Sequence, residues 1–156
     1  MQKNKPLSRD VAIVGAGISR FGAFKAKNGR DLFVEAYQDL RDSIDRGFDP
    51  KAIESIYIGN YSSDLFENQG HNAPLLADAV GLIPCPATRV EGACASSGVA
   101  IREGLIAIAS GMMDVVLVGG MEKMTNLPTS EVTDTLATAG DMTYEVSAGF
   151  TFPGFY

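Results

Sequence analysis

Residues 88–109 read TRVEGACASSGVAIREGLIAIA, and this stretch decides the fold. Residues 88–91 predict a short strand, and residues 96–109 predict a helix with apolar side chains at three- and four-residue spacing. The apolar face of that helix consists of Val99, Leu105, Ile106 and Ala109. Small residues fill the connection, because a sharp turn from strand to helix leaves no room for larger side chains. The stretch therefore predicts a strand, a tight turn that contains Cys94, and a helix.

The alternation of strand and helix continues on both sides of this unit. Short apolar runs closed by glycine predict further strands at residues 11–14, 55–59 and 114–118. Recurring apolar side chains followed by glycine predict helices at residues 31–46 and 72–80. Asp49 before Pro50 has the pattern of a helix N-cap and first helical residue, which predicts a short helical turn.

Strands joined by helices of this length pair in parallel through right-handed crossovers. Their nearly continuous apolar character fits a sheet that is covered on both faces. We therefore expect an α/β fold with a mostly parallel mixed sheet and helices on both faces. Beyond residue 124 the periodicity fails. Residues 125–156 are rich in Thr, Gly and Pro and predict a loop with a turn or two of helix, so we expect one domain over 1–124 and a separate segment over 125–156.

Composition excludes several classes of protein. The chain has 156 residues, 46% of them hydrophobic and 21% charged, which fits one globular domain with its own core. A net charge of -6 argues against a nucleic-acid-binding surface. We expect no membrane span and no secretory signal, because no apolar run is long enough and the first ten residues are polar. Two cysteines cannot build a disulfide framework, so a reducing, cytoplasmic location is expected.

Gly15 and Gly17 follow a predicted strand and match two of the three glycines of a dinucleotide-binding fingerprint. The third glycine position is occupied by Arg20. The second predicted strand is followed by Asn60 rather than an acidic residue for a ribose. We therefore expect a tight turn at a strand end rather than a nicotinamide or flavin site.

His71 and Cys85 are expected to have structural roles. His71 is the single histidine and stands in a polar stretch without the cysteine or carboxylate cluster of a metal site. It therefore predicts a surface or helix-start residue, and no metal. Cys85 lies between Pro84 and Pro86, where no following helix would lower the pKa of its thiol.

Cys94 is the candidate nucleophile. Its turn lies at the carboxyl edge of the predicted sheet, where α/β folds bind their ligands. The N–H groups and positive dipole end of the following helix favour the thiolate and can hold the oxyanion of an acyl group. Tight packing of helix on sheet is the alternative reason for the small residues. A cysteine form of the α/β-hydrolase turn is disfavoured, because that fold places its histidine after the nucleophile and His71 precedes Cys94.

Three segments together resemble the thiolase family, in its order and at about its spacing. Residues 11–17, VAIVGAG, with RFG at 20–22, are similar to the opening strand and turn of thiolases. Residues 90–98, VEGACASSG, resemble the nucleophilic-cysteine segment. Residues 115–125, VVLVGGMEKMT, resemble the strand and the Gly-Gly-x-Glu-x-Met stretch after it. The Ala and Ser residues after Cys94, and GFTFP at 149–153, are more similar to the archaeal and sterol-carrier-type branch.

The resemblance implies an acyl-CoA C-acyltransferase, which joins or cleaves a carbon–carbon bond between acyl-CoA units. Cys94 would carry the acyl group as a thioester, and its backbone N–H would be one of two donors to the thioester oxyanion. A coenzyme A thioester would be the substrate, with no permanently bound cofactor. Residues from 125 onward would begin a loop domain that covers the CoA.

The resemblance also implies an assembly. The strand at 88–91 would lie at a dimer interface, because thiolases pair this strand across a two-fold axis. We therefore expect a homodimer or a higher homo-oligomer. Some members of this branch bind a small zinc-binding subunit of oligonucleotide-binding fold, which is a candidate partner here.

The motifs of the second half of a thiolase are not matched. That half carries an Asn-Glu-x-Phe stretch, a Gly-His-Pro histidine and a second, acid–base cysteine, which activate the nucleophile and move the α-proton. We therefore expect these 156 residues to be an N-terminal half, inactive by itself. Two alternatives stay open: a related condensing enzyme of the ketoacyl synthase or hydroxymethylglutaryl-CoA synthase type, or a non-catalytic half-subunit that acts as a binding or assembly module.

Overall fold

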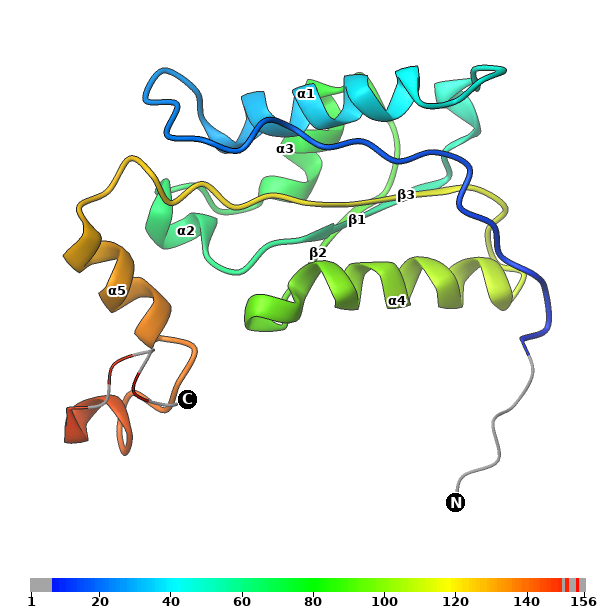
Figure 1. Cartoon of the computed structure of the whole chain (residues 1–156). Coiled ribbons are helices and arrows are strands. Elements are labelled where there is room, and N and C mark those ends of the chain that lie inside the picture. Colours follow the sequence, from blue (N-terminus) through cyan, green and yellow to red (C-terminus); the bar gives the residue numbers. More distant parts are fainter. Residues whose placement is uncertain (1–6, 150, 152–153, 155–156) are drawn as a thin grey trace.

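A computed structural model describes residues 7–149, 151 and 154 of the chain. Three strands form one sheet in the order β2-β1-β3, and every pairing among them is parallel. They are β1 (Ser55–Gly59), β2 (Ala87–Val90) and β3 (Val116–Gly120). Helices α1 (Gly29–Asp42) and α3 (Asn72–Ala79) cover one face, and α4 (Ser96–Ala109) covers the other (Figure 1). The predicted α/β class with helices on both faces is confirmed.

The strand order explains why the two faces carry different helices. The chain leaves β1 through α2 (Ser63–Phe66) and α3 and returns beside it as β2. It then crosses β1 in the opposite direction through α4 to form β3 on the far side. Crossovers between parallel strands are right-handed as a rule, and two that run in opposite directions place their helices, here α3 and α4, on opposite faces. β1 is therefore the central strand, covered on both sides.

The main hydrophobic core lies between the sheet and the α1–α3 layer. Ile56 and Ile58 of β1 are completely buried there, because alternate residues of a strand point to the same face. Phe33 and Tyr37 of α1 and Leu76 of α3 pack in the same cluster. Burying side chains of this size stabilises the fold by about 1.5–3 kcal/mol each.

The face of α4 that contacts the sheet differs in part from the predicted apolar face, of which Ala109 is buried as expected. Its buried residues include the small side chains of Ser96, Ala100, Gly104 and Ala107. Leu105 and Ile106, predicted to face the core, are 37% and 44% exposed. Small residues let the helix approach the sheet closely, so at this interface close approach outweighs the burial of large side chains.

The strand predicted at residues 11–14 is not formed. Ile13 and Val14 are 89% and 72% exposed, and no described strand pairs with this segment. The chain runs along α1 instead: the Ile18 N–H donates to the Asp39 carboxylate at 2.9 Å, and the Ala16 N–H donates to the Ser43 hydroxyl at 3.0 Å. The prediction was wrong because a buried strand needs a hydrogen-bonded neighbour and a covering layer, and these residues have neither.

Several element ends differ by a few residues, and side chains explain two of these shifts. Helix α1 begins two residues earlier than predicted because Asn28 and Asp31 form a reciprocal capping box. It ends at Asp42, although residues as far as 46 were predicted to be helical. Strand β3 begins at Val116 rather than 114, since the Glu54 carboxylate accepts the N–H groups of the two preceding residues. The Asp49 side chain caps the predicted short helical turn after α1, which is confirmed.

The segment after residue 124 contains a helix, α5 (Thr129–Ala137), which begins directly after Pro128. It lies beyond the carboxyl ends of the strands, apart from the three layers (Figure 1). Its nine residues exceed the predicted turn or two of helix. The proposed division of the chain at residue 124 stays a prediction. Phe150, Phe152 and Pro153, which contributed to the resemblance, lie outside the described residues, as do 1–6 and 155–156.

Candidate functional site

A cavity of about 740 Å³ opens at the carboxyl ends of the three strands. Residues that follow each strand contribute to its wall, together with the N-terminal segment and α1. The residues with polar or reactive side chains on this wall include Asn60, Tyr61, Cys94, Ser97, Glu122 and Lys123. Parallel strands end at one edge of a sheet, so topology alone brings these distant parts of the sequence together.

Cys94 lies in the connection between β2 and α4, in a 3-10 turn over Ala93–Ala95. It is exposed and lines the cavity. The Ser96 hydroxyl closes the turn by donating to the Ala93 carbonyl at 2.7 Å and accepting from the Gly92 N–H at 3.0 Å. Ala93 has a φ of 47°, a left-handed conformation that is unfavourable for a side chain. The predicted tight turn is present, and it presents the thiol to the cavity.

Two glycines allow the start of α4 to lie against the sheet. A Cβ atom on Gly59 would come within 2.5 Å of the Ser96 carbonyl carbon and the Ser97 nitrogen. A Cβ on Gly120 would lie 2.1 Å from the Ser97 hydroxyl oxygen. Gly59 is the last residue of β1, and Gly120 is the last residue of β3. A Cβ on either one would point toward the start of α4. The place of the Cys94 turn therefore depends on residues about 30 positions away in the chain.

The start of α4 offers positive potential next to Cys94. The helix has 14 residues, and among the described residues no side chain caps its first turn. The first N–H groups of a helix have no partner within it, and the aligned peptide dipoles add partial positive charge there. An anion or a developing oxyanion is stabilised at such a position.

Glu122 stands two residues after the end of β3 and lies partly buried in the wall of the cavity. Its carboxylate accepts the N–H groups of Tyr61 and Ser62, at 2.8 and 3.2 Å, and the Asn60 amide at 3.1 Å. Burial raises the pKa of Glu122, and these hydrogen bonds and the charge of Arg89 oppose that rise. Next to it, the buried Lys123 ammonium donates to side-chain oxygens of the loop that follows.

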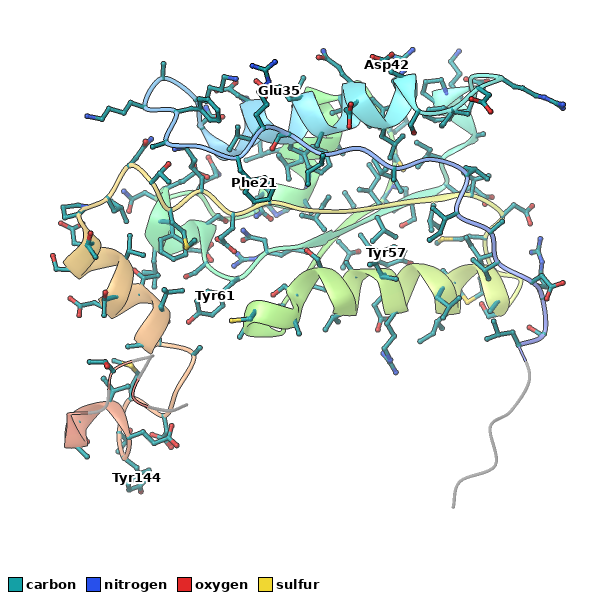
Figure 2. The ribbon with its side chains drawn as sticks, in the orientation of Figure 1. Phe21, Glu35, Asp42, Tyr57, Tyr61 and Tyr144 are labelled. Atoms are coloured by element: carbon teal, nitrogen blue, oxygen red, sulfur yellow. The ribbon has the colours of Figure 1, made fainter. Side chains whose placement is uncertain are left out.

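The sequence did not single out Asn60, Tyr61, Arg89, Glu122 and Lys123 as site residues. Glu122 and Lys123 lie in the Gly-Gly-x-Glu-x-Met stretch that resembles thiolases, which was the one available signal. Tyr61 extends beyond the end of β1 (Figure 2), and its hydroxyl contacts Thr138 Oγ1 at 2.6 Å. This contact joins the cavity wall to the end of α5.

His71 and Cys85 lie away from the cavity wall. His71 is exposed at the N-cap position of α3, as predicted for a helix-start residue. Cys85 is half-buried, and its Sγ lies 3.5 Å from the Ile53 carbonyl oxygen. Burial raises the pKa of the Cys85 thiol. Within the described ranges, no three His, Cys, Asp or Glu side chains are grouped as metal ligands.

None of the helices in the described part of the chain is both long and apolar enough to cross a bilayer.

We expect the two thiols to differ in their reaction with iodoacetamide. Cys94 is exposed and Cys85 is not, and the raised pKa of Cys85 leaves less thiolate at a given pH. Alkylation of the native protein at pH 8 should therefore be on the order of tenfold faster at Cys94. The rate at Cys85 should continue to increase above pH 9. Peptide mass spectrometry over time measures both rates, and equal rates in the native protein would contradict the structure.

Comparison with known proteins identifies a family. Residues 11–153 match the family described as "Thiolase, N-terminal domain". The chain is 45% identical over 148 residues to the acetyl-CoA acetyltransferase of Methanocaldococcus jannaschii, and 43% identical to that of Methanothermobacter thermautotrophicus. These alignments cover 95% of this chain but only 37% and 38% of the relatives.

The solved structure of an acetyl-CoA acetyltransferase from Syntrophomonas wolfei has a similar fold. Its TM-score is 0.53 at 21% identity, over 65% of this chain and 26% of that chain. At this identity the likeness concerns the fold alone. The family match and the two archaeal relatives nevertheless cover nearly the whole sequence. The chain therefore belongs to the thiolase family, and it matches the N-terminal domain of that family.

Proposed function

We propose that this chain supplies the acyl-carrying cysteine of a thiolase-type acyl-CoA C-acyltransferase, and that Cys94 is the nucleophile. The observation that carries the proposal is an exposed cysteine in the β2–α4 turn, at the start of an uncapped helix and in the wall of a cavity. The names of the archaeal relatives support an acetyl-CoA substrate class.

The proposed reaction has two steps. Cys94 Sγ attacks the carbonyl carbon of an acyl-CoA, the bond from that carbon to the CoA sulfur breaks, and the thiol proton passes to CoA. The acyl carbon then bonds to the α-carbon of a second acyl-CoA. That carbon loses a proton, and the Cys94 sulfur regains one as it leaves. The products are a 3-ketoacyl-CoA and free enzyme, and the reverse sequence cleaves the same bond.

The chain's own residues account for part of this chemistry. The first N–H groups of α4 would stabilise the oxyanion that forms when Cys94 is acylated. No histidine lines the described cavity, because His71 lies at the start of α3. We therefore propose that the base which activates Cys94, and the group that moves the α-proton, come from the remainder of a complete thiolase subunit.

The assembly and the loop segment belong to the same proposal. β2 is an edge strand of the sheet, which supports its pairing with a second copy across a two-fold axis. Leu136 of α5 lines the cavity, which supports a role for residues from 125 onward in covering a bound CoA. A cytoplasmic location and a small zinc-binding partner subunit stay predictions.

Acylation of the complete natural polypeptide tests the proposal. After incubation with acetyl-CoA and acid quenching, the peptide that contains Cys94 should gain one acetyl group, and the Cys85 peptide should not. The isolated 156-residue chain should show no turnover, because no histidine lines the described cavity. An acetyl group on another residue, with none on Cys94, would reject the assignment. Full turnover by the isolated chain would reject the need for further residues.

A further inference from the structure

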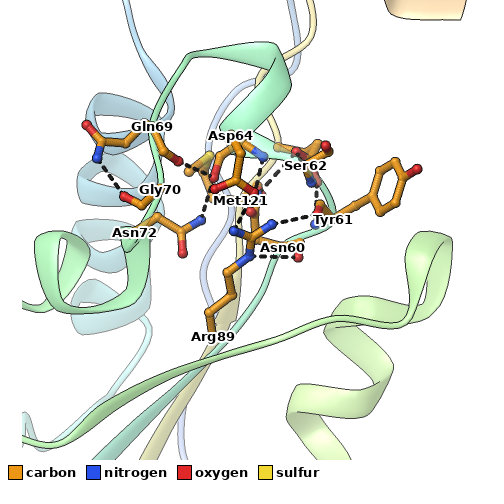
Figure 3. A network of polar contacts seen from close by, with 11 residues as sticks. Asn60, Tyr61, Ser62, Asp64, Gln69, Gly70, Asn72, Arg89 and Met121 are labelled. Carbon is orange, nitrogen blue, oxygen red and sulfur yellow. Dashed lines mark hydrogen bonds and ion pairs between the residues drawn. The ribbon is translucent and has the colours of Figure 1, made fainter. Parts of the chain in front are cut away.

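The ends of all three strands meet in one polar cluster beside the Cys94 cavity. Asn60 directly follows β1, Arg89 belongs to β2, and Glu122 stands two residues after the end of β3. Between them lies the backbone of residues 60–62, which connects β1 to α2 (Figure 3). Asn60 and Tyr61 of this turn line the cavity. Three parts of the sequence therefore converge on one short turn.

The two faces of this turn bind opposite charges. On the N–H side, the Glu122 carboxylate accepts the Tyr61 and Ser62 amides. On the carbonyl side, the Arg89 guanidinium donates to the Asn60 carbonyl at 3.3 Å and to the Tyr61 carbonyl at 2.6 Å. Arg89 is held in turn by the Asp64 carboxylate at 2.6 Å. Hydrogen bonds to ionised groups are about twice as strong as neutral ones, so this turn is fixed from both sides.

On the basis of the proposed function, we propose that Glu122 is a positioning residue for acyl transfer. Together with Arg89, it clamps residues 60–62 as a rigid wall against which the acyl-CoA is held for attack by Cys94. Glu122 acts through the backbone of the turn.

The carboxylate is required because three donors converge on it. The Tyr61 N–H, the Ser62 N–H and the Asn60 side-chain amide all bond to its two oxygens. A glutamine has a single acceptor oxygen, and its own NH₂ group would face one of these donors. At least one donor in this partly buried site would therefore lose its acceptor, which costs more than an ordinary hydrogen bond. The turn should then open more often.

The clamp also reaches the loop segment. Tyr61 belongs to the clamped turn, and its hydroxyl lies 2.6 Å from Thr138 Oγ1 and donates to the Thr135 carbonyl at 3.2 Å. Movement of the turn would therefore shift both the wall beside Cys94 and the contact with α5. Because a misplacement of about 1 Å can cost about a hundredfold in rate, a loose turn should slow the reaction.

Hydrogen exchange tests the clamp without any reference to activity. In the complete protein, Glu122→Gln should speed exchange of the Tyr61 and Ser62 amides on the order of tenfold. The matched control is Glu131→Gln, which removes an exposed carboxylate on α5 and should leave this exchange unchanged. Unchanged exchange at residues 60–62 in Glu122→Gln would overturn the clamp.

Single-turnover acylation by acetyl-CoA tests the positioning role. Glu122→Gln should lower the maximal rate of Cys94 acylation about tenfold, while the number of Cys94 sites that are finally acylated stays the same. A merely structural role would reduce the number of active sites and leave the rate per site unchanged. Faster exchange with an unchanged acylation rate would therefore overturn the proposal and leave the function of Cys94 intact.

A second variant keeps the positioning role testable if Glu122→Gln folds poorly. Arg89 uses three different nitrogens for the Asn60 carbonyl, the Tyr61 carbonyl and Asp64. Arg89→Lys keeps the charge but offers a single nitrogen in place of this planar fork, so it should loosen the same turn and slow acylation in the same direction. If wild-type Cys94 takes up no acyl group, the proposed function fails and the positioning role fails with it. Slow acylation in the variants alone, with a rapidly acylated wild type, supports both.

Discussion

Replacing Cys94 with alanine in the complete protein is expected to lower kcat/KM for acyl transfer by at least about a thousandfold. The substitution removes the atom that we propose forms the thioester, so only binding and oxyanion stabilisation would remain. The neighbouring Ser96 hydroxyl cannot replace it, because that hydroxyl is engaged with Gly92 and Ala93 within the turn. Steady-state condensation or thiolysis assays measure the loss.

Cys85→Ala is the matched control for this experiment. It removes the other thiol of the chain, which is half-buried and does not line the cavity. Activity should stay within about twofold of the wild type, although loss of a partly buried side chain will lower stability somewhat. Retention of activity by Cys94→Ala, or an equal loss in both variants, would contradict the assignment of Cys94.

Replacing Gly59 with alanine should lower the free energy of unfolding by about 1–3 kcal/mol. The added Cβ would lie 2.5 Å from backbone atoms of Ser96 and Ser97, and backbone cannot rotate away as a flexible side chain can. Helix α4 must therefore shift away from the sheet, and the Cys94 turn must shift with it. We expect a lower urea midpoint by circular dichroism and slower acylation of Cys94.

The control for Gly59→Ala is Gly98→Ala, in the first turn of the same helix. A Cβ at this position meets nothing within 4 Å, and alanine is the better helix former. The free energy of unfolding should stay the same or rise by up to about 1 kcal/mol. If both variants are destabilised equally, close approach of α4 to β1 is not the cause.

Local patterns predicted the central elements closely. β1 and α4 have the bounds that the sequence predicts, and β2 differs by one residue. In these segments the apolar periodicity and the terminal glycines predict the same element that the packing of the fold stabilises. The strand predicted at 11–14 failed because an apolar run forms a strand only where another strand pairs with it, and the run itself carries no information about that partner.

The same limit applies to the site. The small residues around Cys94 predict the tight turn, since they are adjacent in sequence. The clamp on residues 60–62 could not be predicted in this way, because Arg89 and Glu122 are about 30 and 60 positions from the turn they hold. Their convergence depends on the order of the strands.

By itself the sequence determined an α/β chain with a cysteine in the turn between a strand and a helix, because those features depend on residues a few positions apart. The tertiary structure decided the order β2-β1-β3, the small-residue face by which α4 contacts the sheet, and the meeting of three strand ends around one turn. Contacts of this kind join residues that are distant in the sequence, and they stabilise the fold only once the sheet has brought those residues together.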